Sequence, residues 1–126
     1  MALRLLLVED HAAFRQALKH LLDLRPGMRV VAECGSVAEC RALGDLLKAV
    51  DLALLDLMLP DGDGLELVAV LRGSNPKVRV LVLSASSEPG LDERVTEAGA
   101  DGLLDKATPL TEIVSEVGRL AGAGRA

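Results

Sequence analysis

Hydrophobic residues along the chain fall into short continuous runs, separated by segments in which apolar residues recur with a longer period. Continuous runs of strand length are typical of strands buried on both faces of a parallel sheet. Apolar residues that recur every three or four positions predict helices with one buried face. We expect strands at residues 3–8, 28–34, 52–57, 78–83 and 102–104.

The segments between these strands predict helices, and several residues indicate where each helix begins or ends. Ser36 stands three residues before a glutamate, which is the spacing of an N-terminal capping box. Gly73 is expected to close its helix in the left-handed conformation, and Gly44 is a weak point within another helix. Thr108 is expected to cap the last helix, with Pro109 at the favoured first position. The predicted helices cover residues 12–24, 36–47, 65–71, 91–98 and 109–120.

Strands that alternate with helices through short connections predict an α/β fold, with a doubly wound parallel sheet of five strands. The chain has 126 residues, a length that suits one domain with a substantial core. We expect this domain to cover residues 1–121. The glycine- and alanine-rich residues 122–126 are expected to form a tail, or the start of a linker to an output domain absent from this chain.

Composition and charge narrow the class of protein. Half of the residues are hydrophobic, but the chain has one Phe and no Tyr or Trp, so the core must be aliphatic. The net charge of −5 argues against direct nucleic-acid binding by this segment. No stretch suits a signal peptide or a membrane span, and Cys34 and Cys40 lack partners at zinc-site spacing. We therefore expect a cytoplasmic protein with reduced, partly buried thiols and no membrane contact.

Polar residues recur where the predicted strands end, with the second strand as the exception. Glu9 and Asp10 follow the first strand, Asp56 ends the third, Ser84 follows the fourth, and Lys106 follows the fifth. In an open parallel sheet, ligands bind beyond the carboxyl ends of the strands. Asp56 alone would equally suit a strand end that faces water. Because acid, hydroxyl and amine groups recur at the same edge of the sheet, we favour a functional site.

The chemistry of these groups narrows the kind of site. Clustered carboxylates repel one another, and burial raises their pKa values unless a cation relieves them. A set of oxygen ligands without cysteine suits Mg²⁺, and we expect His11 to be a loop residue rather than a ligand. A carboxylate beside a divalent cation, a lysine and a hydroxyl is equipped for phosphoryl transfer. The carboxylate would attack phosphorus and become an acyl phosphate.

Several motifs together resemble the receiver domain of bacterial response regulators, over about residues 3–120. They are Glu9-Asp10-His11, Asp56 followed by residues 58–64, Ser84-Ala85, and residues 99–106. The resemblance implies a flavodoxin-like (CheY-like) fold with strand order 2-1-3-4-5. With Phe14-Arg15 nearby, the first motif most resembles the NarL-like (LuxR-type) subfamily, whose receivers usually precede a DNA-binding helix-turn-helix domain.

The resemblance implies a role for each acidic residue. Asp56 would be the phosphoacceptor, which takes a phosphoryl group from a phosphohistidine on a partner histidine kinase. Glu9 and Asp10 would hold Mg²⁺, together with Asp56 and the main-chain carbonyl of Met58. The protein would then be a signalling phosphoacceptor rather than an enzyme with a separate substrate, and its output would be control of transcription.

The resemblance also implies how the phosphorylated state is held and read. Ser84 would reorient to hydrogen-bond the phosphoryl group, and Lys106 would pair with it. Met58 and Ser86 stand where the family tunes the lifetime of the acyl phosphate. A homodimer through the last two helices and the fifth strand is a further expectation.

The chain departs from the family pattern at two positions. The family usually has Tyr or Phe where this chain has Leu103, so an aromatic ring cannot swing inward here on phosphorylation. The family commonly has Pro directly after the lysine, often with a cis bond. Here Ala107 follows Lys106, and we expect an ordinary trans peptide bond.

Two other functions compete with the receiver reading. One is a Mg²⁺-dependent phosphohydrolase of the haloacid dehalogenase type, but that class needs a second Asp where this chain has Met58. The other is a receiver-fold interaction module that works without phosphorylation. Leu103 favours that idea, whereas the intact polar set of the strand ends argues against it.

Overall fold

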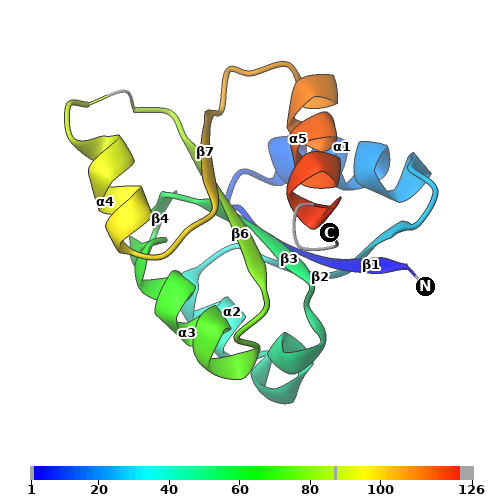
Figure 1. The fold of residues 1–126 in the computed structure, drawn as a ribbon, viewed down its shortest axis with the longest axis horizontal. Helices are drawn as coiled ribbons and strands as arrows, with labels where there is room; N and C mark the ends of the chain where they lie inside the picture. The colour runs from blue at the N-terminus through cyan, green and yellow to red at the C-terminus, as the bar shows by residue number, and fades with distance from the viewer. Residues whose placement is uncertain (1, 87, 123–126) are drawn as a thin grey trace.

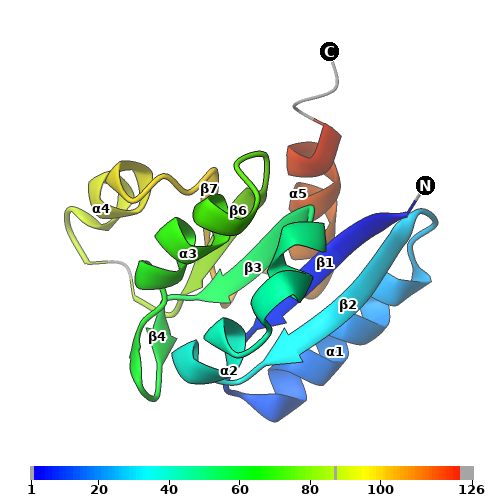
Figure 2. The same ribbon diagram turned by 90° about the horizontal axis from the view of Figure 1, so that it is seen from below.

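A parallel sheet lies between two layers of helices in the computed structural model, which describes residues 2–86 and 88–122 (Figures 1 and 2). The sheet order is β2-β1-β3-β6-β7, and every neighbouring pair is parallel. In chain order of the five main strands this is 2-1-3-4-5, which confirms the predicted fold. The strands are β1 (Leu3–Val8), β2 (Met28–Cys34), β3 (Leu52–Asp56), β6 (Arg79–Ser84) and β7 (Gly102–Asp105).

The helices cover the two faces of the sheet in unequal sets. Helices α1 (Ala12–Leu24) and α5 (Leu110–Gly122) pack on the face that includes Leu5 and Leu7. The other face, which includes Leu6 and Val8, is covered by α2 (Val37–Arg41), the 3-10 helix η1 (Gly44–Ala49), α3 (Glu66–Ser74) and α4 (Leu91–Glu97). Alternate residues of the central strands β1, β3 and β6 thus enter two separate aliphatic layers.

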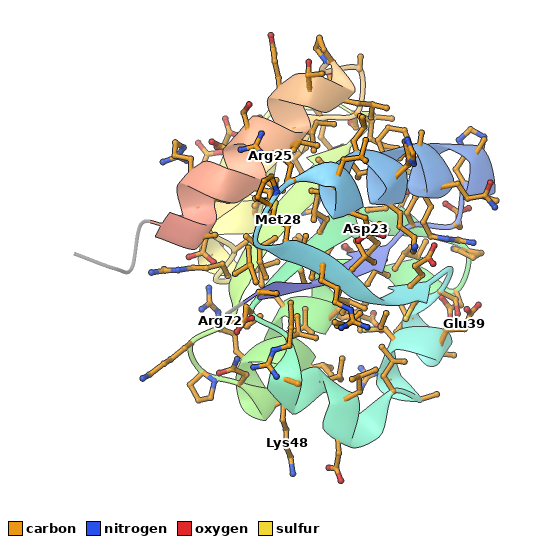
Figure 3. The ribbon with its side chains drawn as sticks, turned by 90° about the vertical axis from the view of Figure 1, so that its right-hand side faces the viewer. Asp23, Arg25, Met28, Glu39, Lys48 and Arg72 are labelled. Carbon is orange, nitrogen blue, oxygen red and sulfur yellow. The ribbon has the colours of Figure 1, made fainter. Side chains whose placement is uncertain are left out.

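Two side chains tie helices to the sheet, and both are labelled in Figure 3. Asp23 of α1 accepts a hydrogen bond of 2.9 Å from the amide of Val30 in the edge strand β2. Arg72 of α3 donates to the carbonyl oxygen of Val78 at 2.7 Å and to the carboxylate of Asp101 at 2.9 Å. The helices are therefore held to the sheet by polar contacts as well as by the aliphatic layers.

The predicted helix at residues 36–47 is wrong in its length. Helix α2 ends at Arg41, and η1 begins at Gly44, which has a φ of +56°. The left-handed conformation of this glycine ends the α-helical path, so the segment continues as a 3-10 helix. The predicted cap is confirmed, since the hydroxyl oxygen of Ser36 accepts from the amide of Glu39 at 3.0 Å.

The ends of α3, α4 and α5 also bear on the predicted helix bounds. Gly73 lies inside α3, which continues to Ser74, so the predicted left-handed cap is wrong. Gly99 follows α4 with a φ of +95°, as expected of a residue that stops a helix. Helix α5 begins at Leu110, and the carbonyl of Pro109 accepts from the amide of Ile113 at 3.1 Å. Pro109 therefore occupies the capping position predicted for Thr108.

The other expectations concern the ends of the chain, the thiols and the peptide bonds. Gly122 is the last residue of α5, and the rest of the predicted tail lies outside the described residues. Cys34 and Cys40 are free and more deeply buried than expected. No cis peptide bond occurs within the described ranges, as predicted for Lys106 and Ala107. In those same ranges, no helix has the length and apolar character to cross a membrane.

A short hairpin that the pattern did not predict follows β3. It pairs β4 (Met58–Leu59) with β5 (Gly62–Asp63) in antiparallel register. Asp61 lies in the turn of this hairpin, and its carboxylate accepts hydrogen bonds from the amides of Val37 and Ala38 at 2.8 and 2.9 Å. These two hydrogen bonds lower the pKa of Asp61, and they join the hairpin to the start of α2.

Gly64 lets the hairpin fold back onto the end of β3. Its amide donates to the carbonyl of Leu57 at 2.8 Å. A Cβ atom at this position would collide with the carbonyl oxygen of Asp56 and would lie only 3.1 Å from the carbonyl carbon. The absence of a side chain therefore permits the backbone approach that shapes the loop next to Asp56.

Substitution of two glycines tests this account of the backbone. Gly64→Ala should lower the free energy of unfolding by about 1–3 kcal/mol, because the loop must move away from Asp56. Gly73→Ala should raise it by as much as about 1 kcal/mol, because a helical glycine with open space around it gains from alanine. Urea denaturation followed by circular dichroism measures both changes. A loss of stability in Gly73→Ala would instead indicate that Gly73 adopts the left-handed conformation of a helix cap.

Candidate functional site

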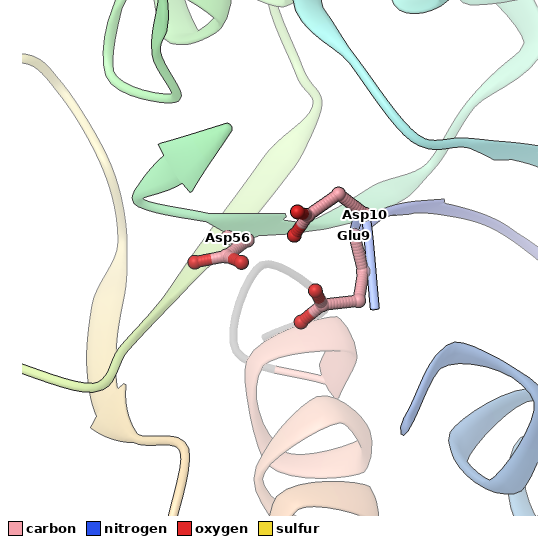
Figure 4. Close-up of side chains that lie close together, drawn as sticks. All are labelled: Glu9, Asp10 and Asp56. Carbon is pink, nitrogen blue, oxygen red and sulfur yellow. The ribbon is translucent and has the colours of Figure 1, made fainter. Parts of the chain in front are cut away.

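The carboxyl ends of four strands bring the predicted polar residues to one edge of the sheet. Asp56 is the last residue of β3 and Ser84 is the last of β6, while Glu9 follows β1 and Lys106 follows β7. One carboxylate oxygen from each of Glu9, Asp10 and Asp56 lies within 4.8 Å of the other two (Figure 4). The structure thus brings the acidic residues and the lysine together, as the sequence predicts.

Asp56 is buried at the centre of this cluster, with 6% of its surface exposed. One carboxylate oxygen, Oδ1, accepts from the amide of Met58 at 3.1 Å. The other, Oδ2, accepts from Nζ of Lys106 at 3.3 Å. The side chain is therefore oriented by the loop on one side and by a positive charge on the other.

Glu9 lies deeper than its neighbour Asp10, which is exposed. Its Oε2 accepts from the amide of His11 at 2.9 Å. Its Oε1 lies 2.6 Å from Nζ of Lys106 as an ion pair, but this oxygen accepts no well-oriented hydrogen bond from the described residues. Burial raises the pKa of Glu9, and repulsion from Asp56 adds to the rise although Lys106 opposes it.

Lys106 is the ammonium group that faces these carboxylates. Burial on its own would lower the pKa of Lys106, but contacts with Glu9 and Asp56 outweigh burial and raise it. Its Nζ also lies 4.9 Å from the centroid of the Phe14 ring, on the ring face. The amino group is therefore charged and is held by three different side chains.

The cluster has the donor set of a site for a hard divalent cation. Three carboxylates face one ammonium group, and a buried oxygen of Glu9 lacks a hydrogen bond within the described chain. A cation with oxygen ligands would neutralise the excess negative charge and satisfy that oxygen. His11 is exposed and stands at the N-terminal end of α1, outside the cluster, as expected of a loop residue.

Ser84 lies at the same edge, but its hydroxyl group is engaged by its own loop. The hydroxyl donates to the carbonyl oxygen of Ser86 at 3.1 Å and accepts from the amide of Ser86 at 3.0 Å. Leu103 is half-buried next to this loop. Ser84 and Leu103 both line a cavity of about 470 Å³ beside the start of α4. A change in the Ser84 hydrogen bonds would therefore alter the loop that leads into α4.

Sequence reasoning missed the site contacts that α1 and α4 provide. Arg15 donates from Nη1 to the main-chain carbonyl of Glu9 at 2.5 Å. Arg94 of α4 pairs with Asp63 of the hairpin at 3.1 Å and with Glu88 at 2.9 Å. The contacts of α1 could have been predicted from its place in the sequence. Residues in the first turn of a helix that follows β1 must lie near the carboxyl end of that strand.

Comparison with known proteins gives an independent assignment. Residues 5–118 match the family model described as "Response regulator receiver domain". The DNA-binding transcriptional activator DevR/DosR of Mycobacterium tuberculosis is 40% identical over 124 residues, which cover 97% of this chain and 55% of that protein. Response regulator UvrY of Escherichia coli K12 is 34% identical over 119 residues, which cover 91% and 52%. The chain thus spans about half the length of these relatives.

Solved structures share the fold closely. The signal receiver domain of NarL from Mycobacterium tuberculosis has a TM-score of 0.85 and 32% identity, covering 97% of this chain and 98% of that one. A LuxR-family response regulator from Aurantimonas sp. SI85-9A1 also has a TM-score of 0.85, with 28% identity and coverage of 97% and 86%. Since the family match extends over nearly the whole length that the structure describes, this protein belongs to the response regulator receiver domain family.

Proposed function

We propose that the chain is a phosphoacceptor module in which Asp56 receives a phosphoryl group from a phosphohistidine of a histidine kinase. The observation that carries this proposal is the position of the Asp56 carboxylate. It is buried, it contacts the Lys106 ammonium group, and it lies within a cluster of acidic oxygens at the carboxyl end of the sheet. This arrangement combines a nucleophile with positive charge for the incoming group.

In the transfer step, a carboxylate oxygen of Asp56 attacks phosphorus. The bond between phosphorus and the imidazole nitrogen of the donor breaks, and its electron pair stays on that nitrogen. The Met58 amide, which contacts Asp56 Oδ1, orients the carboxylate for attack. The Lys106 ammonium group neutralises negative charge on the transferred phosphoryl oxygens.

The acidic residues would hold a metal ion beside the reacting carboxylate. Glu9, Asp10 and Asp56, with the main-chain carbonyl of Met58, would hold Mg²⁺, and the charge excess and the unsatisfied Glu9 oxygen support this assignment. When bound, Mg²⁺ supplies positive charge that neutralises phosphoryl oxygens. Glu9 and Asp10 therefore act as ligands, while Asp56 is both ligand and nucleophile.

Phosphorylation is read out through Ser84 and the loop after it. To donate to a phosphoryl oxygen, the Ser84 hydroxyl must give up the hydrogen bond that it donates to the carbonyl oxygen of Ser86. The loop then rearranges beside Leu103, and α4, β7 and α5 form the responding face, which would also be the face of a homodimer. Met58 and Ser86 would be the positions that tune the lifetime of the acyl phosphate.

The output is control of transcription from a cytoplasmic protein of the NarL-like (LuxR-type) subfamily. The similarity to a DNA-binding transcriptional activator and to a response regulator supports this output. The chain spans about half of their length, and we assign DNA binding in those relatives to the part that this chain does not match. A net charge of −5 makes this segment a poor ligand for DNA.

The competing functions have less support. A phosphohydrolase of the haloacid dehalogenase type needs a second acid where this chain has Met58, a side chain with 72% of its surface exposed. A phosphorylation-independent module would not need Lys106 to be in contact with both Glu9 and Asp56. Burial of carboxylates costs free energy, and a role in phosphoryl transfer explains why the protein has them at this position.

Acetyl phosphate with Mg²⁺ should add one phosphoryl group to the protein, at Asp56. The Asp56→Asn protein should gain none, because an amide is not a nucleophile for this transfer. Intact-mass spectrometry checks both results. Absence of a phosphorylated species in the wild-type protein, or an equal yield in the variant, would contradict the assignment of Asp56.

Addition of Mg²⁺ should raise the melting temperature, because the ion binds the folded state alone. An ion concentration about ten times the dissociation constant contributes about 1.4 kcal/mol, a shift of roughly 5 °C for a domain of this size. Asp10→Asn should remove most of the shift without loss of the fold, since Asp10 is exposed. Thermal circular dichroism with Mg²⁺ and with excess chelator measures this, and equal shifts in the two proteins would exclude Asp10 as a ligand.

Beryllofluoride with Mg²⁺, which imitates the phosphorylated carboxylate, should move backbone amide signals of residues 90–120. The cause is the rearrangement of the loop after Ser84, next to α4 and β7. Ser84→Ala should give smaller shifts at the same occupancy, because alanine cannot bind the phosphoryl analogue. Nuclear magnetic resonance and size-exclusion chromatography report the switch and the dimer. Unchanged signals and elution would exclude this face as the output.

A further inference from the structure

The one aromatic residue of the chain lies against the site. Phe14 is the sole Phe, and the chain has no Tyr or Trp. It stands in the first turn of α1 and is half-buried against the aliphatic layer between α1, α5 and the sheet. The Nζ atom of Lys106 lies over its ring, 4.9 Å from the centroid. A leucine would fill the same layer, so packing alone does not explain an aromatic residue at this position.

The ring provides a contact that the carboxylates cannot. An ammonium group is attracted to the negative face of an aromatic ring, and this attraction is strongest where water is excluded. The Lys106 side chain has 18% of its surface exposed, so the pair is largely shielded from solvent. The ring carries no charge, so its attraction for the ammonium group does not depend on the charge of the carboxylates.

Lys106 needs such a restraint because its other partners compete for it. Its Nζ lies 2.6 Å from Oε1 of Glu9 and 3.3 Å from Oδ2 of Asp56. A lysine side chain is flexible, and its ammonium group can turn toward any nearby acceptor. A ring beneath the ammonium group adds a third contact that restrains the group near these carboxylates and keeps it at Asp56.

We propose that Phe14 is a positioning residue for phosphoryl transfer, which holds the Lys106 ammonium group at Asp56 through the face of its ring. The inference rests on the proposed function, because it assigns Phe14 to the transfer step at Asp56. It also extends the site to α1. The other contact from the first turn of this helix is the hydrogen bond that the Arg15 side chain donates to the main-chain carbonyl oxygen of Glu9.

Three variants separate positioning from packing. Phe14→Leu keeps an apolar side chain of similar size but removes the ring, and Phe14→Tyr keeps the ring. Leu21→Ala is the matched control, because Leu21 is also a half-buried residue of α1 that packs on the same aliphatic layer. It should lower the melting temperature at least as much as Phe14→Leu and leave the phosphorylation rate constant unchanged.

The rate with acetyl phosphate and Mg²⁺ is the first measurement. Phe14→Leu should lower the maximal rate constant by about three- to tenfold, the size of effect expected from one cation–π contact. Phe14→Tyr should stay within about twofold of wild type. An unaltered rate in Phe14→Leu, or a rate in Phe14→Tyr as low as in Phe14→Leu, would overturn the inference.

Nuclear magnetic resonance of the Lys106 side chain is the second measurement, and it needs no phosphoryl donor. The ε-methylene protons should resonate upfield in the wild-type protein and in Phe14→Tyr because of the ring current, and this displacement should vanish in Phe14→Leu. No displacement in the wild-type protein would overturn the inference while phosphorylation still occurs. Failure of the wild-type protein to accept a phosphoryl group, with the displacement present, would instead overturn the proposed function and the inference with it.

Discussion

Repulsion among three carboxylates, relieved by a single ammonium group, is the constraint on which this structure depends. Glu9, Asp10 and Asp56 are close enough to share a ligand, and Lys106 contacts the two that are buried. Such a group of charges costs free energy in a low-dielectric environment. The sheet withstands that cost because its central strands β1, β3 and β6 are mainly aliphatic and buried.

The loops around that edge turn the constraint into a site. The polar side chains come from the ends of four strands, and main-chain amides of the adjoining loops orient two of them, as the amides of His11 and Met58 orient Glu9 and Asp56. The Ser84 hydroxyl is held in the same way by Ser86. The sheet therefore sets where the groups lie, while the loops set which way they point.

The accuracy of the sequence predictions follows the range of the interactions involved. The bounds of β1, α1 and β2 agree with the structure because continuous aliphatic runs and helical periodicity are local signals. The left-handed conformation arose at Gly44 rather than at Gly73, since either glycine can adopt it and tertiary packing selects between them. The contact of Phe14 with Lys106 joins α1 to the loop after β7. A local sequence pattern does not predict a contact between residues so far apart in the chain.

The hairpin after Asp56 is attached unequally on its two sides. Toward α2, the Asp61 carboxylate binds two main-chain amides, whereas toward α4 the connection is an exposed ion pair between Asp63 and Arg94 that water and salt weaken. The hairpin is thus attached firmly to α2 and weakly to α4. Thermal opening of this loop would uncover Asp56 from the α4 side first, and raised ionic strength would make that opening more frequent.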